Sequence, residues 1–463
     1  MVGKARARAR GRRARRAGLH RRPPATGQIL GRVRQAGAVS RNRVLRRFWI
    51  SQMLSEIGDW VGLLGIAALL YHQTGQALLA SASLGALYLP YLFAPWLVGL
   101  CARIPPRTLL VGADFLRAGL IMMLVLPLPP WVLLGLVFLA SVPTSVYEAT
   151  RAAAVPEYAP DPDTQDDALV LFQSTQQAAT MVGFLLGGAA LAFIGFQAAI
   201  VVNAVSFLLS GLLLVRVPYL GPFVDSGHSA FRLAKAAAVA LRVQPVLRRT
   251  FLFSIVSAST IMAGEALVVV YGAESGHSGL AGPLAASSAA VAAVLALMLP
   301  RHLGSEALLR VSAFTMVIGS LTAIGAFAVH PAVLAGFIGY VGLGIISAPG
   351  ALLYVVAVRE MGPAVRAPVF ALAQVGLMGG QAAVAVMAGH LADVLSVGSS
   401  IALWQIPTGV LAVVWFVIGV KAKPAPVALR QVATDPELPQ PSAEPAVSAA
   451  AGVHGITVLP ATR

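Results

Sequence analysis

The chain has 463 residues, of which 57% are hydrophobic and only 11% are charged. Its mean hydropathy is +0.79. A soluble globular protein carries about 25% charged residues, and a soluble domain of this composition could not bury its apolar surface. The composition therefore excludes a soluble fold and indicates a multi-pass membrane protein.

The formal net charge of +16 comes from one segment at the amino terminus. Residues 1–47 hold 16 of the 34 Lys and Arg residues and no acid, so the remaining 18 basic residues match the 18 acidic ones. The segment lacks apolar periodicity, which predicts a disordered cytoplasmic tail whose residues 4–47 contact anionic lipid. Alternatives are RNA binding, which the lack of aromatic residues disfavours, a transit peptide, or a misassigned start codon. We expect no nucleic-acid partner.

The sequence lacks the motifs of the common catalytic and metal sites. Cys101 is the single cysteine, so neither an intrachain disulfide nor a cysteine cluster for a metal is expected. No nucleotide-binding P-loop, His-Glu-x-x-His motif or Gly-x-Ser-x-Gly motif occurs. We therefore expect no enzymatic activity, no cofactor and no bound metal.

Twelve apolar runs approach the length that crosses a bilayer. They span residues 48–71, 78–101, 109–128, 131–149, 168–194, 196–215, 251–271, 280–299, 307–329, 332–358, 365–391 and 401–420. If the amino terminus is inside, the inner segments hold 33 of the 34 Lys and Arg residues, and Arg117 lies within a span. This agrees with the positive-inside rule. We therefore expect a cytoplasmic (inner) membrane protein with both termini in the cytoplasm.

The twelve runs divide into two sets of six. Residues Pro156–Pro160 after span four resemble Arg359–Pro363 after span ten, which suggests an internal repeat. The expected fold is an all-α membrane protein with two parallel six-helix bundles and pseudo-two-fold symmetry, comprising residues 48–215 and 251–420. Such bundles are typical of secondary transporters, with a site between the halves, and one chain is expected to work as a monomer.

Two hydrophilic segments complete the predicted organisation. The linker, residues 216–250, carries basic residues on one helical face and is expected to form either an amphipathic helix on the inner leaflet or a solvated connection. Residues 421–463 are rich in Pro, Ala and Ser, which predicts a disordered cytoplasmic tail.

Three motifs in the first half carry a resemblance to a known family. Ser55–Trp60 is similar to Ser-x-x-Gly-Asp-Trp, Ala113–Arg117 to Ala-Asp-x-x-Arg, and Arg151–Pro156 to Arg-x-Ala-x-x-Pro. Together they resemble the major facilitator superfamily, particularly its bacterial macrolide-efflux and siderophore-exporter branch, over about residues 46–421. The resemblance implies the major facilitator fold and efflux of a small organic molecule.

Three of the acidic residues inside the predicted spans are candidates for coupling. A carboxylate in hydrocarbon is costly unless it is protonated, paired or exposed to a wet cavity. Asp59 is expected near the middle of span one, and Glu56 lies one turn earlier, so the two carboxylates favour binding of a proton. Glu265 stands alone in span seven. We expect these residues to couple protons or substrate, and a role in helix packing is the alternative for each.

Charged pairs at helical spacing form a second group. Asp114 and Arg117 are three residues apart, so an ion pair within the helix is their simplest explanation. This pair is also a candidate gating ion pair. Glu148 and Arg151 have the same spacing at the inner end of span four, and with Arg107 they are predicted to take part in an inner gate or to be solvated helix ends.

Neutral groups complete the candidate set. Five glutamines are predicted to line the cavity or to join helices: Gln173, Gln176, Gln177, Gln374 and Gln381. Gly183, Gly187 and Gly188 form a small-residue motif that allows close helix packing.

The favoured hypothesis is a secondary active transporter that exports an amphipathic organic compound, such as a drug, a macrolide or a siderophore-like molecule, in exchange for protons. Its expected partners are a small-molecule substrate, protons and the lipid bilayer. The alternatives are an uptake permease for a small metabolite and a membrane scaffold that recruits partners through the basic tail.

Overall fold

The computed structural model describes residues 41–101, 103–159, 162–219, 238–239, 241–242, 244–299, 303–328, 332–361 and 363–418. Three sequence predictions lie wholly or mainly outside these residues. They are the basic tail, the helix in the linker and the carboxyl-terminal tail. The described residues form helices joined by short turns, with no β-strand among them.

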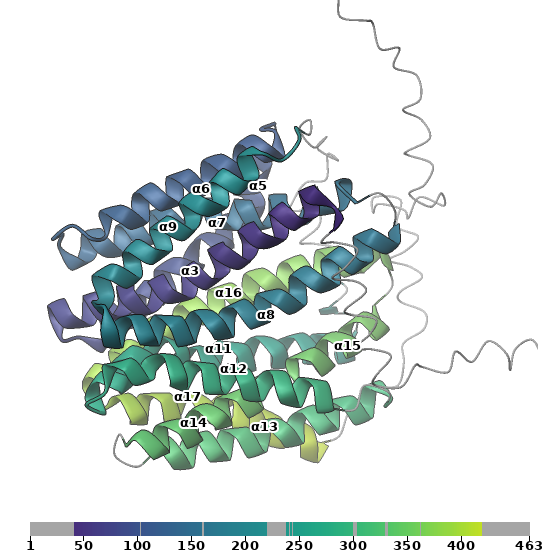
Figure 1. The fold of residues 1–463 in the computed structure, drawn as a ribbon. Coiled ribbons are helices and arrows are strands. Elements are labelled where there is room, and N and C mark those ends of the chain that lie inside the picture. Colours follow the sequence, from purple (N-terminus) through teal and green to yellow (C-terminus); the bar gives the residue numbers. More distant parts are fainter. Residues whose placement is uncertain are drawn as a thin grey trace, which may run out of the picture.

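The first half of the chain forms the helices on one side of the molecule (Figure 1). They are α3 (Arg43–Thr74), α4 (Ala77–Tyr88), the 3-10 helix η1 (Leu89–Phe93), α5 (Ala94–Cys101), α6 (Pro106–Met123), α7 (Pro130–Glu157), α8 (Pro162–Phe193) and α9 (Gly195–Val215).

The second half forms the helices on the other side. They are α11 (Pro245–Glu274), the 3-10 helix η2 (Ser278–Leu280), α12 (Ala281–Met298), α13 (Ser305–Phe327), α14 (Val333–Ser347), α15 (Gly350–Glu360), α16 (Pro363–Val394) and α17 (Val397–Ile418). Across the two halves, α4 packs along α16 and α8 along α12.

Each of the twelve predicted apolar runs coincides with one helix or with two or three consecutive helices. In the described part of the chain, nine helical segments are long and apolar enough on their own to cross a bilayer. The α6 helix is less apolar because its 18 residues include Arg107, Asp114 and Arg117. The predicted all-α, multi-pass membrane fold is confirmed.

Prolines interrupt two of the predicted runs. Pro90 lies in η1, which separates α4 from α5, and Pro349 separates α14 from α15. Because proline has no N–H group, it cannot continue the helical hydrogen-bond pattern. Pro143, however, lies within the continuous helix α7.

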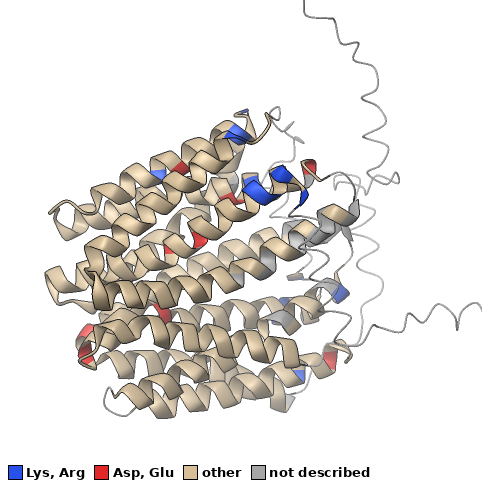
Figure 2. Ribbon diagram, viewed as in Figure 1, with Lys and Arg blue, Asp and Glu red and all other residues tan. Residues whose placement is uncertain are grey.

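The two ends of the bundle differ in charge (Figure 2). At one end, which we call the basic end, α3 begins and α9 finishes, and Arg47 Nη1 donates to the carbonyl oxygen of Arg216. Most of the basic residues of the described segments gather here. At the opposite, distal end, α3 finishes at Thr74, α4 begins at Ala77 and α16 finishes at Val394.

Candidate functional site

A buried arginine on α6 is shared by two carboxylates. Arg117 Nη2 lies 2.8 Å from Asp59 Oδ2 on α3, and Nη1 lies 3.7 Å from Asp114 Oδ1. The Arg117 and Asp114 side chains are 4% and 0% exposed, whereas that of Asp59 is 34% exposed. The prediction of an ion pair within α6 is therefore incomplete, because the shorter contact joins α6 to α3.

Other polar groups hold this cluster in place. Ser210 Oγ on α9 donates to Asp114 Oδ2 at 2.6 Å, and Ser51 Oγ on α3 lies 2.7 Å from Ser210 Oγ. The guanidinium carbon of Arg117 lies 3.7 Å from the centroid of the Phe207 ring, a cation–π contact. One cation with two carboxylates carries a charge of −1 when all three are ionised. Such a net charge inside a membrane span is costly unless it is paired, protonated or exposed to water.

Replacing Arg117 with Gln is expected to destabilise the protein strongly. Without the guanidinium, two carboxylates lose the cation that they share in a buried place, and breaking a buried pair costs about 3–5 kcal/mol. Thermal unfolding of the detergent-purified protein measures the effect. Arg310→Gln is the matched control, because Arg310 pairs with Glu306 at 2.6 Å on the exposed start of α13. Such a surface pair contributes about 0–1 kcal/mol, and equal melting temperatures for both variants would contradict the prediction.

Glu56 belongs to a different set of contacts from Asp59. Its Oε1 accepts hydrogen bonds from Trp60 Nε1 at 2.9 Å and Thr180 Oγ1 at 3.3 Å, and its Oε2 accepts one from Gln176 Nε2 at 3.4 Å. Thr180 and Gln176 lie on α8. Glu56 therefore joins α3 to α8, while Asp59 joins α3 to α6.

The predicted gating residues come together only in part. Arg151 Nη2 lies 2.7 Å from Glu148 Oε2, and both residues are on α7, near the basic end. Arg107 is half-buried at the start of α6 and forms no ion pair with a described residue. The structure thus pairs Glu148 with Arg151 but does not add Arg107. A role in gating for these three residues, and for Asp114 and Arg117, stays a prediction.

A cavity of about 520 Å³ lies between the two halves. Thr180 and Phe184 from α8 line one wall, Glu265 from α11 another, and Ser288 from α12 a third. Most of the remaining lining residues are alanines, at positions 178, 285, 289, 292, 293, 296 and 348. Glu265 is half-buried and makes no hydrogen bond or ion pair with another described residue. The cavity therefore combines one unpaired carboxylate with a mainly apolar wall.

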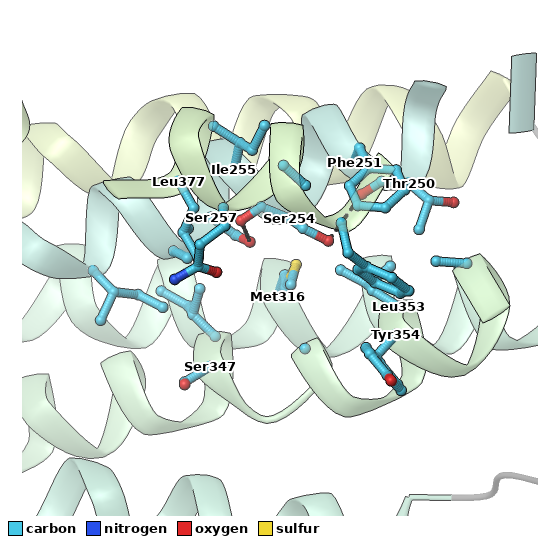
Figure 3. A pocket seen from close by; sticks show the side chains of 18 residues that line it. Thr250, Phe251, Ser254, Ile255, Ser257, Met316, Ser347, Leu353, Tyr354 and Leu377 are labelled. Atoms are coloured by element: carbon cyan, nitrogen blue, oxygen red, sulfur yellow. Dashed lines mark hydrogen bonds between the residues drawn. The ribbon is translucent and has the colours of Figure 1, made fainter. Parts of the chain in front are cut away.

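A second cavity, of about 310 Å³, lies within the second half (Figure 3). Its wall includes Phe251, Leu353 and Tyr354, and its hydroxyl groups come mainly from α11. Ser254 Oγ donates to the carbonyl oxygen of Thr250, and Ser257 Oγ to that of Ser254. Because these hydroxyl groups already donate to their own helix, this cavity favours apolar ligand groups.

The two cavities adjoin at a break in a helix. Ser347, the last residue of α14, lines both. Pro349 then separates α14 from α15. Discontinuous helices at the midplane are typical of binding sites in secondary transporters, so this break supports a binding site at the junction.

The five predicted glutamines have different environments. Gln176 bonds to Glu56, and Gln374 lines the second cavity. Gln381 is half-buried on α16, and its Oε1 has no hydrogen-bond partner among the described residues. The side chains of Gln173 and Gln177 lie outside the described part of the structure.

The glycines of the predicted motif lie in two different helix contacts. Gly183 and Gly187 pack against α3, where added Cβ atoms would lie 2.7 Å from Trp60 Cβ and 2.9 Å from Leu64 Cδ1. Gly188 instead faces the other half, and a Cβ there would lie 2.6 Å from the Cα of Gly282 on α12. Small residues thus allow close packing both within the first half and between the halves.

A hydrogen-bonded contact also joins the two halves at the distal end. Asp393, near the end of α16, accepts hydrogen bonds from the backbone N–H groups of Ala77 at 2.6 Å and Leu78 at 2.9 Å. These groups belong to the first turn of α4, where a negative charge is favourable. Together with Gly188 and Gly282, Asp393 closes the space between the halves at this end. On α8 and α12, the cavity residues lie on the basic-end side of the closure.

Sequence reasoning missed Asp393, Thr180 and Ser347. An acid two residues past the end of a predicted span was the available signal for Asp393, but its partners Ala77 and Leu78 are far away in the sequence. Thr180 and Ser347 carry no motif, and only the packing of the helices reveals their positions in the cavities.

The sequence profile of the Major Facilitator Superfamily matches residues 48–367. The chain belongs to this family. None of the curated protein sequences matches the chain significantly. Members of the family have a transporter fold, and the two-sided helical arrangement with a cavity between the halves agrees with it.

Solved structures share this fold at low sequence identity. The nucleoside transporter NupG is 15% identical, with a TM-score of 0.64 over 82% of this chain and 100% of that one. A POT family transporter in complex with a thioalcohol-conjugated peptide is 13% identical, with a TM-score of 0.58 over 80% and 95%. An inward-facing, unoccupied bacterial homolog of the human lysosomal transporter Spinster is 14% identical, with a TM-score of 0.57 over 80% and 95%.

Proposed function

We propose that this chain is a secondary active transporter that exports an amphipathic organic compound in exchange for protons. The observation that carries the proposal is the asymmetry of the space between the halves. Gly188, Gly282 and Asp393 close its distal end, while the larger cavity extends from this closure toward the basic end. A central cavity that is closed at one end and lies toward the other is the arrangement expected for alternating access.

The cavity walls favour an amphipathic compound over a strongly polar one. NupG is named a nucleoside transporter, and the POT family transporter was solved in complex with a thioalcohol-conjugated peptide. Polar substrates of that kind require several free donors and acceptors. Here the hydroxyl groups of Ser254 and Ser257 are already bonded within α11, and alanines cover much of the larger cavity.

The cluster around Arg117 supports coupling to protons. Its excess carboxylate favours one bound proton, and Asp59 is its most exposed member. Asp59 is therefore the proposed coupling residue, with Glu56 and Glu265 as further acidic groups near the cavity. A proton that moves through 100 mV supplies about 2.3 kcal/mol before any pH gradient is added.

The proposed orientation places the basic end in the cytoplasm. The arginines near the start of α3 and the end of α9 support this orientation through the positive-inside rule. In this orientation the described conformation is closed toward the outside. This is the conformation in which an exporter would bind its substrate from the cytoplasm. The Glu148–Arg151 pair is proposed to belong to the cytoplasmic gate, and residues 4–47 to contact anionic lipid.

Gradient-driven transport in proteoliposomes tests the proposal. Vesicles that carry the protein with its basic end outward and have an acidic lumen should accumulate radiolabelled erythromycin. Accumulation should disappear when a protonophore removes the gradient. Uridine and a dipeptide, supplied in the same way, are the kind of polar substrate that a nutrient permease would carry. Accumulation of either polar compound, or no gradient-driven accumulation of erythromycin, would count against the proposed exporter.

A further inference from the structure

We infer that the larger cavity binds an organic cation, with the positive group on Glu265 and the apolar body extending toward the second cavity. This inference rests on the proposed transport function and specifies its substrate class. Glu265 is the one charged residue among the described residues that line either cavity. It has no partner among the described residues, and a carboxylate held in an apolar wall is stabilised when a cation pairs with it.

The wall composition disfavours an inorganic cation. Metal ions such as Ca²⁺ take 6–8 oxygen ligands, but the side-chain oxygens in the larger cavity come from Glu265, Thr180, Ser288 and Ser347. Thr180 Oγ1 also donates to the carbonyl oxygen of Gln176. No group of three or more His, Cys, Asp or Glu residues suited to a metal ion occurs in the part of the chain that the structure describes. A weakly hydrated organic cation needs fewer ligands.

The second cavity can hold the apolar part of the same ligand. It meets the larger cavity at Ser347, and its wall includes Phe251, Phe370 and Tyr354. The Phe370 and Tyr354 rings are stacked with centroids 5.1 Å apart. The hydroxyl groups on α11 donate to backbone carbonyl groups, so an apolar body here displaces few hydrogen bonds.

The surrounding charges favour cations over anions. Arg117, the buried cation of the first half, is held by Asp59 and Asp114. Glu56, which accepts from the cavity residue Thr180, adds a second negative group near the wall. An anionic ligand of the same shape would meet these carboxylates without a free cation among the described lining residues.

Equilibrium binding of two probes to the detergent-purified full chain tests the inference. Tetraphenylphosphonium and tetraphenylborate have the same shape and opposite charges. The wild-type protein should bind the cation, and the anion should compete at least tenfold less well. Glu265→Gln keeps the side-chain size and removes the charge, so it should weaken cation binding about tenfold to a hundredfold. Glu306→Gln, on the exposed start of α13, is the matched control and should bind like the wild type.

The outcomes separate this inference from the proposed function. No binding of the cation, equal binding of the two probes, or unchanged affinity in Glu265→Gln would overturn the inference. Elution of each variant as a monodisperse peak, with a melting temperature like that of the wild type, shows that lost binding is not lost folding. If charge preference fails while gradient-driven accumulation of erythromycin persists, only the substrate class is wrong. If accumulation fails while charge preference holds, the proposed function is wrong.

Discussion

Replacing Asp59 with Asn is expected to abolish transport driven by a pH gradient, with at least a hundredfold loss of rate. Asp59 Oδ2 lies 2.8 Å from Arg117 Nη2, and Asp114 is the second carboxylate on the same guanidinium. The amide keeps the size and hydrogen-bonding capacity of Asp59 but cannot gain or lose a proton. It leaves Arg117 paired with Asp114 alone. This pair has no net charge, so the driving force for proton uptake disappears.

Two transport assays separate coupling from general damage. In proteoliposomes with an acidic lumen, Asp59→Asn should not accumulate radiolabelled erythromycin. With equal pH on both sides, exchange of labelled for unlabelled erythromycin should continue, because this exchange needs no net proton movement. Glu306→Gln makes the same acid-to-amide change at an exposed site and should keep both activities. Gradient-driven accumulation at the wild-type rate in Asp59→Asn would remove the proposed role of Asp59.

The fold was predictable because membrane helices are determined mainly by local composition. Long apolar runs have few other stable conformations in a bilayer, so each predicted run coincides with helices in the structure. Proline also acts locally, which explains the breaks at Pro90 and Pro349. The same argument fails for Pro143, because neighbouring packing can keep a helix continuous around a proline.

Contacts between helices were much harder to predict. Sequence spacing identifies neighbours within one helix, and it therefore suggested Asp114 as the partner of Arg117. The closer partner is Asp59 on another helix, and its position depends on how α3 rotates against its neighbours. That rotation is set by packing, for example by Gly58 and Gly62, which lie against Ser206 and Asn203 on α9. A single sequence contains no direct signal for this arrangement.

Replacing Gly188 with Trp is expected to hold the distal end open and to stop transport. A Cβ at residue 188 would lie 2.6 Å from Gly282 Cα and 3.0 Å from the carbonyl oxygen of Gly279. Both are backbone atoms and cannot rotate away, so α8 and α12 have to separate. Gly119→Trp is the matched control, because a Cβ at residue 119 meets nothing within 4 Å.

Cysteine labelling from the distal side measures this opening. Ser81 is buried on α4, and its Oγ would lie 1.8 Å from a Cβ on Gly389 of α16, so it reports the closure. With Cys101 replaced by Ser, Ser81→Cys should react slowly with a membrane-impermeant maleimide in the wild-type background. Reaction should be at least tenfold faster with Gly188→Trp and unchanged with Gly119→Trp.

Two contacts close the distal end, the Gly188–Gly282 packing and the Asp393 hydrogen bonds. Their relative strengths explain why a substitution at Gly188 should be enough to open it. Asp393 is exposed, and a carboxylate at an exposed helix start contributes about 0.5–2 kcal/mol. Overpacking a close contact typically costs about 1–3 kcal/mol even where side chains can adjust, and here the opposing atoms belong to the backbone. The Asp393 hydrogen bonds therefore cannot keep the end closed against a Trp at residue 188. Slow labelling of Ser81→Cys in Gly188→Trp would show instead that the contact between α4 and α16 closes this end without α8 and α12.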